Sequence, residues 1–180
     1  LSEEEKAGGD WYVYIQELGQ DPIFSESAYM SLHPASTIKI ADAVLFFKAL
    51  DKKGVTDYKT FMDTYGTASR SFTQLLHAML VNSEEAATTA LEEWTAAVLN
   101  PNQTLHDLGY TQTFISPRQS TAKEMARLLS DLYQGKLVSS PAREIIQRGA
   151  PLLRIQQLPS VPGIVRAKSA FGNDALAGLE

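Results

Sequence analysis

The strongest constraint on this fold is the apolar stretch at residues 33–50, HPASTIKIADAVLFFKAL. Its His33-Pro34 step disfavours helix immediately before Ser36. From Ser36 onward, apolar residues occupy nearly every face of a helix, which predicts a helix buried in a sizeable core. We therefore expect the rest of the chain to be organised around this helix.

The first turn of the same helix carries a hydroxyl and an amine. Ser36 and Lys39 are three residues apart, so on a helix their side chains point the same way and can touch. A lysine can activate a serine if burial disfavours the charged form of the amine. The N–H groups and dipole of the helix N-terminus would stabilise an oxyanion at Ser36. The alternative is that Ser36 only caps the helix and Lys39 is an ordinary surface lysine.

The same S-x-x-K pattern occurs again at Ser120 and Lys123. Short motifs match by chance, so the pattern alone does not identify a nucleophile. The second copy opens an amphipathic helix with polar neighbours, and we expect it to be a coincidental match.

Composition excludes several classes of function. A length of 180 residues fits one domain, residues 1–180, with a real core. The net charge of −5 argues against a nucleic-acid or anionic-membrane partner. No apolar run approaches the roughly 20 residues of a membrane span, and the absence of cysteine excludes disulfides and thiolate metal sites.

The histidines do not suggest metal binding or a serine–histidine hydrolase. His33, His77 and His106 are too scattered for a metal site. No G-x-S-x-G motif surrounds any serine, and only His33 lies close enough to Ser36 to be a candidate catalytic histidine.

Strand patterns occur near both ends of the chain, with helical patterns between them. The expected extended segments are residues 11–18, 28–32, 111–115, 164–168 and 174–179. The expected helices are residues 36–50, 71–81, 84–99, 103–108, 121–133 and one opened by Ser140-Pro141. Capping boxes are predicted at Ser71/Gln74 and Thr121/Glu124, and Glu92 and Glu93 are expected on a solvated helix face. This order predicts an α+β fold whose terminal strands share one antiparallel sheet.

Three short elements carry a resemblance to a known family. PASTIKI at residues 34–40 resembles the nucleophile motif of the class A β-lactamases and penicillin-binding serine enzymes, which are marked by S-x-x-K, S-D-N and K-T-G. SEE at residues 83–85 stands at the S-D-N position, between two expected helices. KSA at residues 168–170 stands at the K-T-G position on a late strand. Their order and context, across nearly the whole chain, favour the catalytic interpretation of Ser36.

The resemblance implies a role for each motif residue. Ser36 would attack a carbonyl and become acylated, with Lys39 as the candidate base. Ser83 would relay the proton to the leaving nitrogen. Lys168 would polarise Ser83 and attract a substrate carboxylate.

The same resemblance implies how the substrate is held. Ser169 would hydrogen-bond the substrate carboxylate, and the strand at Ala170 and Phe171 would dock the substrate backbone. The N–H groups of Ser36 and Phe171 would form an oxyanion hole. None of these steps needs a metal or a cofactor.

The chain departs from the family pattern at two motif positions. Glu85 replaces an asparagine, and an ionised carboxylate cannot donate to a substrate carbonyl as an amide can. Glu85 would pair with Lys39 and keep it protonated, or act as a base itself if its pKa is raised, or simply turn outward at the start of its helix. Ala170 replaces a glycine and adds a methyl group where the substrate approaches.

Two further departures concern turnover and completeness. The β-lactamases activate the deacylating water with a glutamate on a long loop, whereas residues 110–120 here are short and contain no acid. We therefore expect slow hydrolysis of an acyl-enzyme unless Glu85 substitutes. The family's last strand and C-terminal helix would lie beyond Glu180, so a truncated β-lactamase/transpeptidase-like domain is expected.

The preferred hypothesis is a serine hydrolase that forms an acyl-enzyme with β-lactams or with D-alanyl peptides, as a β-lactamase or a D-Ala-D-Ala carboxypeptidase does. The alternative is a non-catalytic module that keeps the fold and binds a cell-wall peptide or other ligand. The expected partner is thus a small β-lactam or a cell-wall peptide. Periplasmic, extracellular or cell-surface location is expected from the family's substrates alone.

Overall fold

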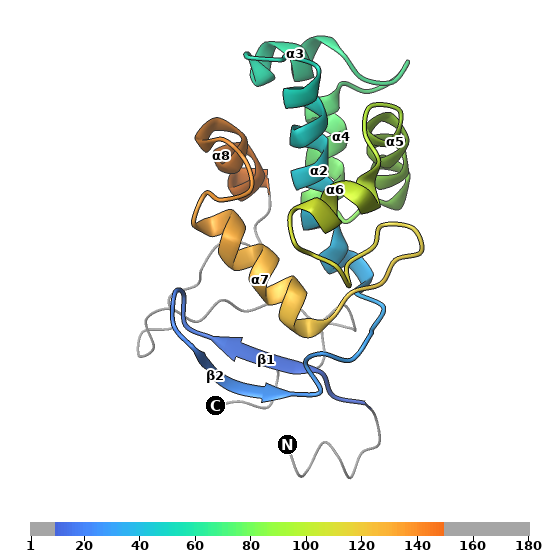
Figure 1. Cartoon of the computed structure of the whole chain (residues 1–180). Coiled ribbons are helices and arrows are strands. Elements are labelled where there is room, and N and C mark those ends of the chain that lie inside the picture. Colours follow the sequence, from blue (N-terminus) through green and yellow to red (C-terminus); the bar gives the residue numbers. More distant parts are fainter. Residues whose placement is uncertain (1–9, 150–180) are drawn as a thin grey trace.

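The computed structural model of the chain describes residues 10–149. Within this part, a β-hairpin lies beside a cluster of helices, in which α2 is surrounded by α4, α5, α6 and α8 (Figure 1). The α+β fold predicted from the sequence is therefore confirmed. The expected strands at 164–168 and 174–179 lie outside the described residues.

The hairpin pairs β1 (Val13–Gln16) with β2 (Pro22–Glu26) in antiparallel register. The first strand was predicted, but the prediction of its partner at residues 28–32 is wrong. A tight turn with Gly19 at a φ of 78° returns the chain at once, so the residues directly after the turn take the pairing positions. Residues 28–32 contribute only an isolated bridge from Leu32 to Ser120.

The central helix begins differently from the prediction of one regular helix. A 3-10 turn, η1 (Ala35–Ile38), contains Ser36 and leads into α2 (Lys39–Lys52). Ser36 makes no helix-capping hydrogen bond. The body of α2 is buried as expected, and Phe46 and Phe47 are fully enclosed.

Two helices form the wall beside α2. After α3 (Tyr58–Thr64), α4 (Phe72–Val81) begins with the predicted capping box of Ser71 and Gln74. The chain then breaks at Ser83 and resumes as α5 (Glu85–Ala96), which packs against both α4 and α2. Phe72 and Trp94 lie against the Phe46 ring, at centroid distances of 5.3 Å each. This aromatic cluster packs the start of α4 and the end of α5 against α2.

The remaining helices are α6 (Pro101–Asp107), α7 (Ala122–Tyr133) and α8 (Ser140–Gly149), and α7 packs on β1. Thr121 caps α7 as predicted, but the reciprocal half of that capping box is absent from the described contacts. The Glu124 carboxylate instead accepts from the Thr113 hydroxyl at 2.6 Å and from the Gln112 amide. Residues 111–115 were expected to be extended and form only a bridge between Phe114 and Gln119.

Candidate active site

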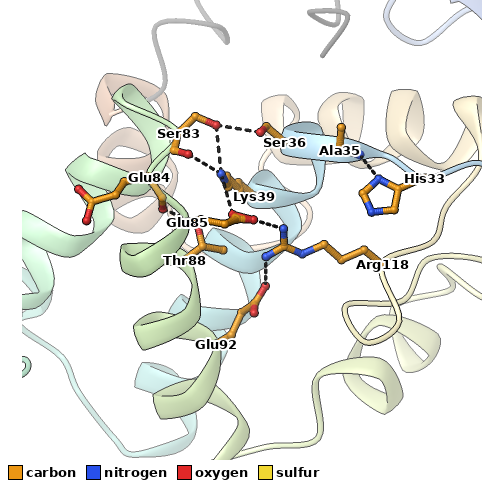
Figure 2. Close-up of polar contacts among 10 residues, drawn as sticks. All are labelled: His33, Ala35, Ser36, Lys39, Ser83, Glu84, Glu85, Thr88, Glu92 and Arg118. Carbon is orange, nitrogen blue, oxygen red and sulfur yellow. Dashed lines mark hydrogen bonds and ion pairs between the residues drawn. The ribbon is translucent and has the colours of Figure 1, made fainter. Parts of the chain in front are cut away.

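Ser36 and Lys39 meet at the start of α2 with opposite exposure. Ser36 is exposed, whereas the Lys39 side chain is 4% exposed. The Lys39 amide donates to the Ser36 carbonyl across the 3-10 turn, but no direct hydrogen bond joins their side chains among the described contacts. They are joined instead through a third residue, Ser83 (Figure 2).

Ser83 lies at the break between α4 and α5. Lys39 Nζ donates to the Ser83 hydroxyl at 3.0 Å and to its carbonyl oxygen at 2.7 Å. The Ser83 hydroxyl in turn donates to Ser36 Oγ at 2.8 Å. An amine, a hydroxyl and a second hydroxyl thus form a continuous chain along which a proton can move.

The backbone of Ser83 adopts a conformation that non-glycine residues avoid. Its φ is 56°, in the left-handed region. The amide of Glu84 reaches back to the Ala78 carbonyl at 3.0 Å, which holds the chain in this bend. Strain of this kind is often retained at functional sites, because the surrounding structure fixes a side chain where chemistry needs it.

Glu85 turns toward Lys39, not outward. Its Oε2 lies 3.1 Å from Lys39 Nζ, and its Oε1 pairs with the Arg118 guanidinium. The hydrogen bond from Arg118 is the main reason that the pKa of Glu85 lies below its ordinary value; partial burial opposes this effect and the bond from Lys39 reinforces it. Of the predicted alternatives, pairing with Lys39 is the observed geometry, and the raised pKa needed for a strong base is not found.

Arg118 extends this ion-pair network beyond Glu85. Its Nη2 lies 3.0 Å from Oε1 of Glu92, so one guanidinium joins two carboxylates on α5. The expectation that Glu92 lies on a solvated face is therefore wrong. From the sequence, the loop at 110–120 was considered only because it contains no acid. Arg118, the basic residue on that loop, was the available signal for an ion pair with the acids of α5.

Asp42, one turn beyond Lys39 on α2, was also missed. Its side chain is buried, and its Oδ2 has no hydrogen-bond partner in the described structure. Burial raises the pKa of Asp42 well above its ordinary value; repulsion from Glu92 and Glu85 adds to this effect, while Arg118 and Lys39 oppose it. The neutral acid is thereby favoured. An acid one turn from Lys39, with apolar neighbours on both sides in the sequence, was the signal for this group.

The other residues considered from the sequence lie away from this cluster. His33 Nδ1 accepts from the Ala35 amide at 3.1 Å and is not directed at Ser36. His77 and His106 lie within α4 and α6. Residues 10–149 contain no group of three metal-binding side chains. Lys168, Ser169, Ala170 and Phe171 lie outside the described residues.

The fold and this cluster define a class. A buried helix that begins with S-x-x-K, a serine at the following helix junction and a flanking antiparallel hairpin are features of the penicillin-recognising serine hydrolases. Residues 2–160 match the model of the β-lactamase enzyme family, and the chain belongs to that family. The resemblance inferred from the three motifs is confirmed.

Solved structures agree on the fold. A β-lactamase from Chitinophaga pinensis DSM 2588 superposes with a TM-score of 0.65 at 14% identity, over 81% of this chain and 65% of that one. A β-lactamase from Burkholderia vietnamiensis gives 0.64 at 22% identity, over 81% and 64%. PBP-A gives 0.61 at 19% identity, over 78% and 64%. The chain therefore spans less than two thirds of each of these structures. No curated protein sequence matches it.

Proposed function

We propose that this chain is a serine hydrolase that forms an acyl ester at Ser36 with β-lactams or D-alanyl peptides. The observation that carries the proposal is the hydrogen-bond chain from Lys39 through Ser83 to Ser36. A mutant of PBP-A, one of the structures with a similar fold, was solved as an acyl-enzyme complex with penicillin G. That chemistry is what the arrangement here would support.

In the acylation step, Ser36 Oγ bonds to the substrate carbonyl carbon and the carbon–nitrogen bond breaks. The hydroxyl proton of Ser36 passes to neutral Lys39, and a proton returns through Ser83 to the leaving nitrogen. The Ser36 N–H, at the start of the 3-10 turn, is one donor for the developing oxyanion. No net proton is gained or lost by the enzyme.

The remaining roles are proposed from the family resemblance. Lys168 and Ser169 would bind the substrate carboxylate, while Ala170 and Phe171 would align its backbone and the Phe171 N–H would complete the oxyanion hole. The proposed unit is a single domain over residues 1–180, acting outside the cytoplasm where cell-wall peptides and β-lactams are found. No helix among the described residues is long and apolar enough to cross a membrane.

Deacylation is proposed to be slow. A base must remove a proton from water to hydrolyse the ester, yet the loop at 110–120 contains no acid. Glu85 is the nearest candidate, and both of its oxygens are engaged by Lys39 and Arg118. Its lowered pKa makes it a weak base. The acyl-enzyme should accumulate.

The test is intact-protein mass after mixing with a penicillin and a cephalosporin, followed from minutes to hours, with Ser36→Ala as control. A lasting increase of one β-lactam mass, absent in the control, supports the proposal. An increase that decays while hydrolysed product accumulates would show a working lactamase and contradict slow deacylation.

A specific observation favours a second candidate, a binding module without turnover. Glu85 Oε2 lies 3.1 Å from Lys39 Nζ, and an ammonium group held in such an ion pair has no lone pair with which to accept a proton from Ser36. If neither an adduct nor a product forms with any β-lactam, this alternative replaces the hydrolase.

A further inference from the structure

Arg118 lies on the loop between α6 and α7, and its guanidinium reaches the ion-pair network around Lys39 (Figure 2). It pairs with Glu85 and, at 3.0 Å, with Glu92 two turns further along α5. Only 22% of the Arg118 side chain is exposed. The Glu85 carboxylate is thus divided, with one oxygen on Arg118 and the other 3.1 Å from Lys39.

Within residues 10–149, the charged side chains around Lys39 come from three elements. Glu85 and Glu92 lie on α5, Arg118 on the loop and Asp42 on α2, beside the uncharged hydroxyls of the serines. With Asp42 protonated, two cations of the described residues, Lys39 and Arg118, face two carboxylates, Glu85 and Glu92. Without Arg118, the same two carboxylates would face a single ammonium group, which would stabilise the protonated form of Lys39.

We propose that Arg118 is a positioning residue for the nucleophile, which divides Glu85 between two cations and so leaves Lys39 able to give up its proton and activate Ser36. The proposal rests on the proposed function. Arg118 favours loss of the Lys39 proton in two ways. It occupies one oxygen of Glu85, and it adds a positive charge near the ammonium group. The lowered pKa of Glu85 is consistent with this arrangement, because it keeps the carboxylate charged and bound to Arg118 at neutral pH.

The neighbouring residue provides a matched control. Glu84 is held by Arg70 in a bidentate pair at 2.6 and 3.0 Å. It belongs to the same junction, but its carboxylate points away from Lys39 (Figure 2). A change at Arg70 therefore removes an equivalent Arg–Glu pair without altering the charges near the nucleophile.

The experiment measures the rate of acylation by a fluorescent penicillin against pH, using the full chain. Arg118→Gln should move the rising limb of the profile up by about one pH unit and slow acylation about tenfold at pH 7, the effect of one lost charge. Glu85→Gln should move the limb in the opposite direction, to lower pH. Arg118→Lys should restore most of the wild-type profile, and Arg70→Gln should leave it unchanged.

Opposite shifts are the decisive result, because damage to packing would affect both partners of the pair in the same way. Shifts of Arg118→Gln and Glu85→Gln in the same direction, or an equal loss of rate at every pH, would overturn the proposal. If thermal unfolding shows that Arg118→Gln does not fold, Glu85→Gln and Arg118→Lys test the proposal in its place. A Glu85→Gln pH profile that is not shifted from the wild type would then overturn the proposal. Absence of acylation in the wild type would overturn both the proposed function and the role of Arg118. If the wild type is acylated, the variants test the role of Arg118 alone.

Discussion

The S-x-x-K pattern occurs twice in this chain, and the structure treats the two copies in opposite ways. In the first, the hydroxyl of Ser36 is exposed and Lys39 is buried beneath it. In the second, Ser120 is completely buried and bonds the Thr113 hydroxyl at 2.9 Å, while Lys123 extends to the Tyr29 hydroxyl at 3.4 Å. An open hydroxyl above an enclosed amine suits nucleophilic attack; the reverse arrangement suits packing.

The comparison also shows what the four-residue pattern lacks. Ser36 and Lys39 are joined by Ser83, which comes from another helix junction, and no such third residue links Ser120 to Lys123 among the described contacts.

The largest expected difference is between Ser36→Ala and Ser120→Ala. The first should abolish the covalent penicillin adduct, because Ser36 supplies the attacking hydroxyl in the proposed mechanism. The second should leave the adduct intact and cost about 1 kcal/mol of stability, the usual value of one buried hydrogen bond. Intact mass and thermal unfolding measure both effects. Loss of the adduct in Ser120→Ala alone would reverse the assignment of the two copies.

The next effect concerns the hydroxyl that each serine contacts. Ser83→Ala should slow acylation on the order of 100-fold, the contribution of a positioned proton relay. Thr113→Ala should not change the acylation rate, although it removes bonds to Ser120 and Glu124 and should cost about 1–2 kcal/mol. Stopped-flow acylation and chemical unfolding separate the two. Equal acylation rates in Ser83→Ala and the wild type would remove Ser83 from the mechanism.

The strained backbone of Ser83 gives a related prediction. Ser83→Gly should lose the relay as Ser83→Ala does, yet be more stable than the alanine variant by about 1 kcal/mol, because glycine adopts a φ of 56° without a steric penalty. Urea unfolding of the two variants measures the difference. Equal stability would mean that the left-handed conformation stores no strain.

A carboxyl group lies close in sequence to each lysine of the two S-x-x-K copies: Asp42 to Lys39 and Glu124 to Lys123. Replacing each carboxyl group by an amide should change the stability of the protein in opposite directions. Because the pKa of Asp42 is raised in the folded state, its stabilising neutral form is fully present below its ordinary pKa of about 3.9 and is lost as pH rises through the folded value. Asp42→Asn should therefore raise stability at pH 7, on the order of 1 kcal/mol, and less at pH 4.

Glu124→Gln, by contrast, should lower stability at both pH values, because this carboxylate accepts bonds from Gln112 and Thr113 that an amide can only partly replace. Melting temperatures at pH 4 and pH 7 test the pair. A fall in stability for Asp42→Asn at pH 7 would show that the buried acid has a partner.

The smallest expected effect is that of Lys123→Met. Its contacts are a long bond to the Tyr29 hydroxyl and an approach of 4.6 Å to that ring, which is worth about 0.5 kcal/mol at a half-exposed site. Acylation should be unchanged. Lys39→Met should instead abolish acylation, and measuring both rates completes the comparison of the two copies.

Local signals predicted much of this molecule. The buried helix, the capping box at Ser71 and Gln74 and the break at Ser83 each depend on residues within a few positions of one another. The errors have a common cause. The second strand was placed at 28–32, although the residues that pair with the first strand follow directly after the turn at Gly19. Glu124 was assigned a local bond, although Thr113, from another segment, holds it.

In the candidate site, too, some features could be predicted from the sequence and others could not. The sequence by itself determined the family, from three motifs in the right order, and the candidates Ser36, Lys39 and Ser83. Only the tertiary structure decided that Glu85 pairs with Lys39 and Arg118, and that Asp42 is enclosed beside them. Arg118 is 33 positions from Glu85, and nothing in either segment specifies the other. Their meeting depends on how the helices pack around α2, and the charge balance around Ser36 and Lys39 follows from that packing.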